Sequence, residues 1–238
     1  MNPPPQRLPS LMPDVPLSSK ATSRVVTSVE SPEPHRGWYA RGYLPHWDHP
    51  GMIQSLNFRL ADSLPASVVE RWQAELADEP ESEAATVIRR RAEKYLDAGH
   101  GECWLRQPDI ARVAEDALLH FDGQRYNLLA WCVMPNHVHV MIETRAGFTL
   151  PDILHSWKSF AANQANKIMG RRGEFWQREY LDRYIRNAEH YAQAVAYIEE
   201  NPVKAGLAKV KTDWPWSSAR FRQPGSDHAG SAGILPAG

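Results

Sequence analysis

The clearest hydrophobic pattern along the chain is an alternation that begins at His137 and runs to Thr144. Side chains alternate between the two faces of a strand, so Val138, Val140 and Ile142 are predicted to point into a core. His137 and His139 then lie together on the opposite face. The preceding Met134-Pro135-Asn136 predicts a tight turn that joins this strand to a partner over residues 126–133.

The remaining pattern predicts a sheet with helices. Strands are expected near residues 52–60 and 180–186, and helices over 65–77, 82–98, 107–121 and 150–169. Thr149 to Asp152 resembles a capping box at the start of the last of these helices. The order of strands and helices is typical of an α+β fold in which an antiparallel sheet carries its helices on one side.

A final helix is predicted to begin after Asn187, a plausible N-cap. Its apolar stripe consists of Ala188, Tyr191, Val195 and Ile198. Tyr197 lies off that stripe, so its hydroxyl is free for chemistry, whereas Tyr191 is interpreted as a core residue. Asn201 follows Tyr197 by one helical turn on the same side. Pro202 and Gly206 are expected to end the helix.

Two imidazoles on one sheet face can form half of a metal site. The alternative is a pair of half-buried histidines that bond to their neighbours, which is the commoner situation for an isolated His-x-His. Asn201 has an alternative too, since an asparagine before a proline can act as a helix C-cap.

Composition predicts three regions: a disordered extension at 1–36, one domain at 37–222 and a flexible tail at 223–238. Aromatic residues crowd the segment 37–50, which either packs on the domain, the interpretation we favour, or stacks on bases. Cys103 and Cys132 fit no zinc pattern. With no apolar run near ~18 residues, no membrane association and a cytoplasmic location are expected.

The net charge of −1 does not by itself indicate a nucleic-acid-binding protein, but its distribution is uneven. Residues 62–116 carry seven Lys and Arg against 13 Asp and Glu, a net charge of −6. Residues 152–222 carry 12 against eight, a net charge of +4. The half that contains Tyr197 is thus the basic half, as binding to a polyanion requires, although solvated surface charge explains this difference almost as well.

Four motifs together resemble the single-tyrosine transposases of the His-hydrophobe-His superfamily, and among them the REP-associated tyrosine transposases. They are PNHVHVMIE at 135–143, FWQREY at 175–180, YIEENPVKAGL at 197–207 and DWPWSSAR at 213–220. The resemblance extends over residues 51–222. It implies a ferredoxin-like sheet and a transposase that cleaves and rejoins single-stranded DNA with hairpin repeats.

The resemblance also implies roles for individual residues. His137, His139 and Asn201 would hold Mg²⁺ or Mn²⁺, and Tyr197 would attack the phosphate to give a 5′-phosphotyrosine and a free 3′-hydroxyl. Many relatives carry glutamine at the position of Asn201, and asparagine is shorter by one methylene. Tyr191, Tyr180 and Tyr184 are alternative nucleophiles, and His190 is a surface residue that could assist proton transfer.

Basic and aromatic residues of the second half are candidate DNA contacts: Lys158, Lys167, Arg171, Arg172, Trp176, Arg178, Arg183, Arg186 and Lys204. Trp176 has the alternative role of anchoring its loop to the core. Two other functions stay open, a DNA-binding module with weak catalysis and a phosphohydrolase that uses water. Related transposases form dimers, but the REP-associated branch favours a monomer here.

Overall fold

The computed structural model describes residues 37–40 and 45–222, with side chains from residue 49 onward. The predictions for the extension at 1–36 and the tail at 223–238 therefore concern residues outside the described range. So do the side chains of the aromatic segment up to residue 48. Its backbone forms a two-stranded antiparallel hairpin of β1 (Gly37–Ala40) and β2 (Pro45–Asp48).

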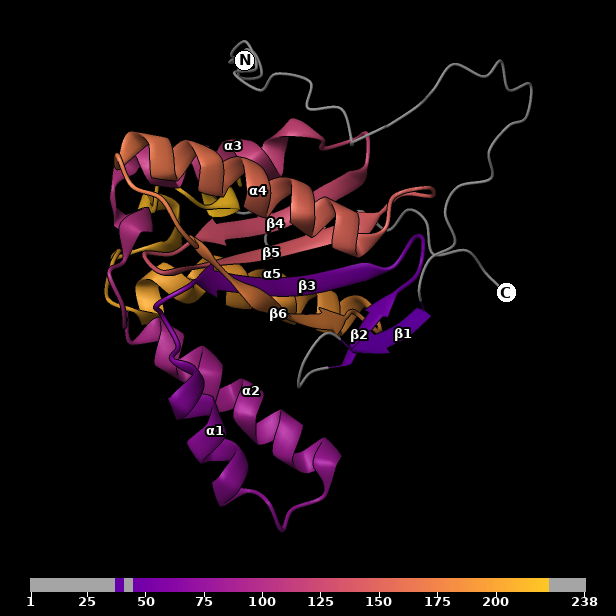
Figure 1. Cartoon of the computed structure of the whole chain (residues 1–238). Helices are drawn as coiled ribbons and strands as arrows, with labels where there is room; N and C mark the ends of the chain where they lie inside the picture. The colour runs from indigo at the N-terminus through magenta and orange to yellow at the C-terminus, as the bar shows by residue number, and fades with distance from the viewer. Residues whose placement is uncertain (1–36, 41–44, 223–238) are drawn as a thin grey trace, which may run out of the picture.

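A four-stranded antiparallel sheet forms the centre of the molecule (Figure 1). The strand order is β4-β5-β3-β6, and the strands are β3 (Ile53–Leu60), β4 (Tyr126–Val133), β5 (His137–Thr144) and β6 (Trp176–Tyr184). With α3 (Pro108–His120) and α4 (Leu150–Ile168), the chain order is β3-α3-β4-β5-α4-β6. This is the ferredoxin-like arrangement, so the predicted α+β fold is confirmed.

The helices lie on both faces of the sheet rather than on one (Figure 1). On one face, α3 and α4 cover the main core, which contains Phe58, Val138, Val140 and Trp157. On the other face, α5 (Ala188–Lys204) packs through Ile198. The prediction placed all helices on one side because the apolar stripe of α5 does not itself indicate which face of the sheet it covers.

Two helices, α1 (Ala66–Glu75) and α2 (Glu81–Asp97), are inserted between β3 and α3. They form a helical hairpin that projects from the sheet in Figure 1 and has a small core of its own. That core consists of Leu64, Val69, Trp72, Ile88, Ala92 and Leu96. The last residue of α2 returns to the sheet.

The chain after α5 lies along the free edge of β4. The backbone N–H of Val133 donates to the carbonyl of Trp216 at 2.8 Å, and Cys132 forms an isolated bridge with Ser217. The indole of Trp214 donates to the Val133 carbonyl at 2.9 Å. This C-terminal segment, residues 211–222, therefore contacts both the sheet and α5. Within the part of the chain that the structure describes, no helix has the length and apolar character needed to cross a membrane.

Candidate active site

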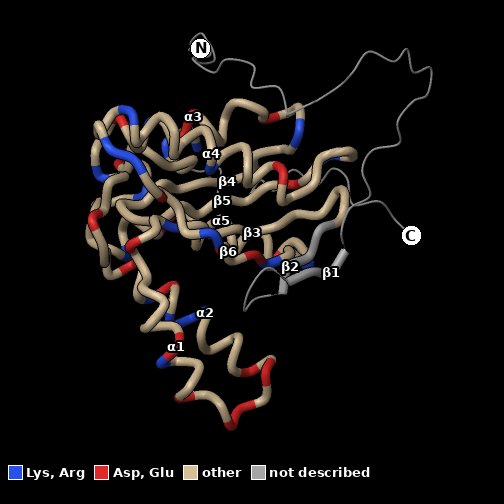
Figure 2. Tube along the Cα trace, viewed as in Figure 1, with Lys and Arg blue, Asp and Glu red and all other residues tan. Residues whose placement is uncertain are grey.

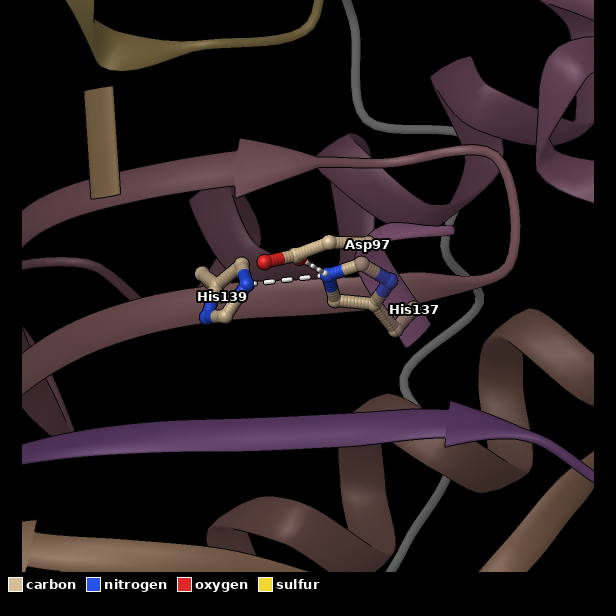
Figure 3. Close-up of side chains that lie close together, drawn as sticks. All are labelled: Asp97, His137 and His139. Carbon is tan, nitrogen blue, oxygen red and sulfur yellow. Dashed lines mark hydrogen bonds and ion pairs between the residues drawn. The ribbon is translucent and has the colours of Figure 1, made fainter. Parts of the chain in front are cut away.

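The two histidines of β5 lie next to each other on the sheet face that α5 covers. His137 is fully buried and His139 is 3% exposed, while the intervening Val138 belongs to the core of the opposite face. Their Nε2 atoms are 2.9 Å apart (Figure 3). The alternation of the sequence thus produces two imidazoles that converge on one point.

The side chain of Asn136 determines which nitrogen of His137 carries the proton. Its amide nitrogen donates to the carbonyls of Leu96 at 3.1 Å and His100 at 2.8 Å. The amide oxygen consequently faces Nδ1 of His137 at 2.7 Å and accepts from it. Nε2 keeps its lone pair, and this is the arrangement found when a histidine binds a metal through Nε2.

Both imidazoles are neutral near neutral pH. Burial, the neighbouring His139 and the charge of Arg59 hold the pKa of His137 well below its usual value. Burial and the positive charge of Lys204 lower the pKa of His139 to about 3. A histidine must be neutral to act as a ligand, so the site favours the form that binds a cation.

A third group, Asp97 at the end of α2, lies beside the histidines (Figure 3). Its Oδ1 is 3.6 Å from Nε2 of His137, and one ligand atom from each of the three residues lies within 4.8 Å of the others. Burial raises the pKa of Asp97 to about 6, an effect that Lys204 partly opposes.

Asp97 is not predicted by the sequence pattern, because no periodicity links α2 to a strand 40 residues later. One signal was available: the interaction of an aspartate with the helix dipole is unfavourable in the last turn, which suggests a specific role.

Tyr197 reaches the same place from α5. Its ring packs edge-on against His139 with 5.4 Å between ring centroids, and the ammonium of Lys204 lies 4.8 Å from the Tyr197 ring. Burial and the carboxylates of Glu93 and Asp97 raise the pKa of the phenol, while the nearby Asn201 side chain opposes this change. The structure therefore brings His137, His139 and Tyr197 together, as the sequence predicted.

Asn201 is a buried residue of α5 and is 1% exposed. Neither atom of its amide group forms a well-aligned hydrogen bond among the described residues, although it lies close to the phenol. The expectation that Pro202 ends the helix is wrong, since α5 continues to Lys204 and Ala205 is its C-cap. Asn201 is consequently not the C-cap, and its unpaired amide is available for another partner.

Pro202 lies in the last turn of α5, and the helix continues past it. There the backbone N–H groups of Ala205 and Leu207 still bond to the carbonyls of Asn201 and Pro202. Gly206, with a φ of +69°, follows the helix end as predicted.

The alternative tyrosines lie elsewhere. Tyr180 is 2% exposed in the core of the opposite face, and Tyr191 packs partly buried in the α5 interface, as predicted from its stripe position. Tyr184 is the last residue of β6. Nδ1 of His190 faces the backbone N–H of Arg186 at 3.3 Å near the start of α5.

The candidate DNA contacts come from α4, the segment 169–175, β6, the segment 185–187 and α5. Figure 2 shows basic residues on the α4 and β6 side and acidic residues at the turn between α1 and α2. Arg171 lies over the Trp104 ring, and Lys158 donates to the Arg178 carbonyl. The exposed side chains are Lys167, Arg172, Arg178, Arg183, Arg186 and Lys204.

Trp176 is a correction to this set. It is 7% exposed and packs against Phe58 in the main core, with 5.0 Å between ring centroids. The loop expected there is the start of β6, where Trp176 pairs with Leu60 across a bulge. The alternative role, anchoring this segment to the core, is the one that the structure supports.

The donor set fits a divalent cation. Bonds of about 2.1 Å place neighbouring ligands of an octahedral ion about 3 Å apart, and the two Nε2 atoms are 2.9 Å apart. Two imidazoles with oxygen donors suit Mg²⁺ or Mn²⁺ better than a closed zinc site. The amide oxygen of Asn201 and Oδ1 of Asp97 are buried oxygen atoms that form no hydrogen bond among the described residues, so both could serve as ligands.

Residues 110–201 match the family model of IS200-like transposases. A REP-associated tyrosine transposase of Escherichia coli (strain K12) is 33% identical over 97 residues, which cover 39% of this chain and 54% of that protein. A Haemophilus influenzae relative of the same class is 27% identical over 103 residues, covering 39% of this chain and 58% of the relative. The matches thus span a little over half the length of these curated relatives.

A solved structure of a REP-associated tyrosine transposase bound to a REP hairpin is also similar, with 23% identity and a TM-score of 0.44. That match covers 84% of this chain and 95% of the other. The matched segment 110–201 contains both histidines of β5, Tyr197 and Asn201. Residues 110–201 are therefore similar to the IS200-like transposases, and the chain is similar in sequence to the REP-associated tyrosine transposases.

Proposed function

We propose that this protein is a metal-dependent transposase that cleaves and rejoins single-stranded DNA with hairpin repeats through a 5′-phosphotyrosine. The observation that carries the proposal is the contact between Tyr197 and His139, with 5.4 Å between their ring centroids. A tyrosine beside two neutral, converging imidazoles suits phosphoryl transfer better than it suits packing alone.

Cleavage would begin when the Tyr197 oxygen attacks the phosphorus of a DNA phosphodiester. The bond to the 3′ oxygen breaks, which leaves a free 3′-hydroxyl on one strand and the 5′ phosphate on the tyrosine. The covalent bond conserves the energy of the broken phosphodiester, so a 3′-hydroxyl can reverse the reaction without ATP. Tyr197 loses its phenolic proton in this step and the departing 3′ oxygen takes up a proton, so no proton is gained or lost overall; both transfers reverse when the strand is rejoined.

Tyr197 needs help with this reaction, because a phenol with a normal pKa of about 10 is a weak nucleophile at neutral pH and here the pKa is raised further. His137, His139 and Asn201 would hold a divalent cation, Mg²⁺ or Mn²⁺. Such an ion polarises the phosphate and stabilises the charge that develops on its oxygens. The ammonium of Lys204, 4.8 Å from the tyrosine ring, would favour both the phenolate and an incoming phosphate.

The sequence similarity to a REP-associated tyrosine transposase, 33% identical over 97 residues, supports the choice of substrate. We propose hairpin-bearing single-stranded DNA as the partner, bound by the exposed basic residues of α4, β6 and α5. A monomer is the oligomeric state we propose, with a homodimer as the alternative, and the cytoplasm is the proposed location.

Two other functions make different demands on the site. A phosphohydrolase that uses water would keep the histidines but would not need Tyr197. A hairpin-binding module would need neither the histidines nor the tyrosine. The convergence of both histidines and Tyr197 favours the transposase.

The test is a cleavage assay on single-stranded DNA that carries the hairpin repeats flanking this gene, with Mg²⁺ or EDTA. We expect a protein–DNA adduct that survives denaturing electrophoresis and forms only with the cation. Cleavage without an adduct would support the phosphohydrolase, and binding without cleavage would support the hairpin-binding module.

A further inference from the structure

The ligands that the family resemblance supplies carry no net charge. Two neutral imidazoles and one amide do not compensate a divalent cation, and Mg²⁺ prefers charged oxygen ligands. We propose that Asp97 supplies the anionic ligand, so that the inserted hairpin of α1 and α2 completes the metal site. This inference rests on the proposed function and adds a ligand from outside the matched segment 110–201.

The distances agree with direct coordination. Oδ1 of Asp97 is 3.6 Å from Nε2 of His137, which is 2.9 Å from Nε2 of His139. Neighbouring ligands of an octahedral ion are separated by about 3 Å and opposite ligands by about 4.2 Å, for bonds near 2.1 Å. The three ligand atoms, all within 4.8 Å of one another, need only small rotations of the side chains to surround one ion.

The surroundings of Asp97 leave its Oδ1 atom without a good partner. This oxygen is buried and forms no hydrogen bond among the described residues, and Nε2 of His137 lies 3.6 Å from it. A buried carboxylate oxygen without a partner is destabilising. A bound cation would remove this cost. Lys204 influences Asp97 electrostatically, which makes a simple charge pair between the two the competing explanation.

The backbone of α2 is fixed to the histidine strand at this point. Asn136 donates to the carbonyls of Leu96 and His100, which flank Asp97 on either side, and its oxygen accepts from His137. One side chain therefore orients His137 and holds the end of α2 in register with it. Leu96, 1% exposed, anchors the same turn in the core of the hairpin.

The experiment is isothermal titration of Mn²⁺ into the full chain without DNA. Asp97→Asn keeps the shape of the side chain but removes its charge. We expect this variant to bind Mn²⁺ with a dissociation constant at least about tenfold higher than that of the wild type, since changes to residues around a metal ion typically weaken its binding by this much. The matched control is Glu93→Gln, which removes the same charge one turn earlier on α2 and should change the constant by less than about twofold. The same titration of Asn201→Ala shows how much the Asn201 amide contributes to Mn²⁺ binding.

An unchanged Mn²⁺ affinity in Asp97→Asn would overturn the proposal, and a lower melting temperature in that variant would then identify Asp97 as a charge partner of Lys204. An equal loss of affinity in Glu93→Gln would overturn it too, because the effect would then be long-range electrostatics.

If Asp97→Asn does not fold, anomalous diffraction from wild-type crystals soaked in Mn²⁺ decides the matter. The proposal requires Mn²⁺ within about 2.3 Å of a carboxylate oxygen of Asp97, and a larger separation contradicts it. Since these measurements use no DNA, they are independent of adduct formation. A protein that binds Mn²⁺ through Asp97 but forms no adduct would contradict the proposed function alone.

Discussion

At the scale of single residues, neighbouring side chains determine the orientation and the charge of the two histidines of β5. Asn136 fixes the tautomer of His137, and burial keeps both rings neutral. Opposite His139 on β3 is Asn57, whose amide nitrogen lies 3.4 Å from Nδ1. The two rings are therefore oriented by neighbours on two separate segments, the turn before β5 and strand β3.

We expect His137→Ala and His139→Ala each to reduce divalent-cation-dependent cleavage by at least about 100-fold, since each removes a ligand and leaves the metal poorly held. The measurement is the rate of cleavage of the hairpin substrate across a Mg²⁺ titration. His190→Ala is the control and should cleave at the wild-type rate. Full cleavage by either β5 variant, or by the wild type in EDTA, would exclude the metal site.

The sequence predicted the position of a site residue where the periodicity of a single strand or helix determines that position. Strand alternation places His137 and His139 together, and the helical stripe separates Tyr197 from Tyr191. Asp97 could not be predicted in this way, because its position depends on how the α1 and α2 hairpin returns to the sheet. Trp176 illustrates a different limit, since an aromatic residue next to a basic loop can equally stack on bases or fill the core.

At the scale of elements, the tyrosine helix is held by the C-terminal segment. The carboxylate of Glu199, two residues after Tyr197, is 1% exposed. It accepts hydrogen bonds from the Ser218 hydroxyl at 2.8 Å and from Nε of Arg222 at 2.5 Å. Ser218 in turn accepts from the backbone N–H of Trp131 on β4 at 3.1 Å. The position of Tyr197 above the histidines thus depends partly on residues 218–222.

Glu199→Gln should destabilise the fold by about 2–3 kcal/mol, because the buried carboxylate is replaced by a neutral amide, which is a weaker hydrogen-bond acceptor for Arg222. Urea denaturation gives the free energy of unfolding. Glu200→Gln makes the same charge change on the next residue of α5 and should cost less than about 0.5 kcal/mol. Equal costs for the two variants would show that the buried network does not hold the helix.

The sequence also predicted most elements, and each departure has an identifiable structural cause. Strands β4 and β5 begin and end as predicted, because a tight turn and strong alternation define them. The strand expected from Tyr180 begins at Trp176, since the bulge opposite Leu60 extends its pairing. Tertiary packing of Ile198 against the sheet determines which face of the sheet α5 covers. No local sequence pattern specifies this face.

At the scale of the whole molecule, charge is segregated between two regions. Figure 2 shows acidic residues at the outer end of the α1 and α2 hairpin and basic residues along α4 and β6. A single strand of DNA is expected to avoid the first region and to follow the second. The net charge of −1 hides this division, which is visible only when the two halves of the chain are counted separately.

Charge reversal at Arg171 and Arg172 should weaken binding to single-stranded DNA and flatten its dependence on salt. The slope of log affinity against log salt falls by about 0.7 for each lost phosphate contact on single strands. Fluorescence anisotropy at several salt concentrations measures both quantities. The control reverses Arg71 and Arg91, which both face Glu75 in the α1 and α2 hairpin. An unchanged slope at Arg171 and Arg172 would place the DNA on another surface.

The central claim is that Tyr197 becomes covalently attached to the 5′ phosphate of cleaved DNA. The most direct measurement is mass spectrometry of the adduct formed with hairpin-bearing single-stranded DNA and Mg²⁺. We expect the modified peptide to contain Tyr197, and we expect Tyr197→Phe to bind DNA and metal without forming an adduct. Tyr191→Phe should still form it, at a cost in stability of about 1 kcal/mol. An adduct on Tyr191, Tyr184 or Tyr180, or cleavage without any adduct, would contradict the account.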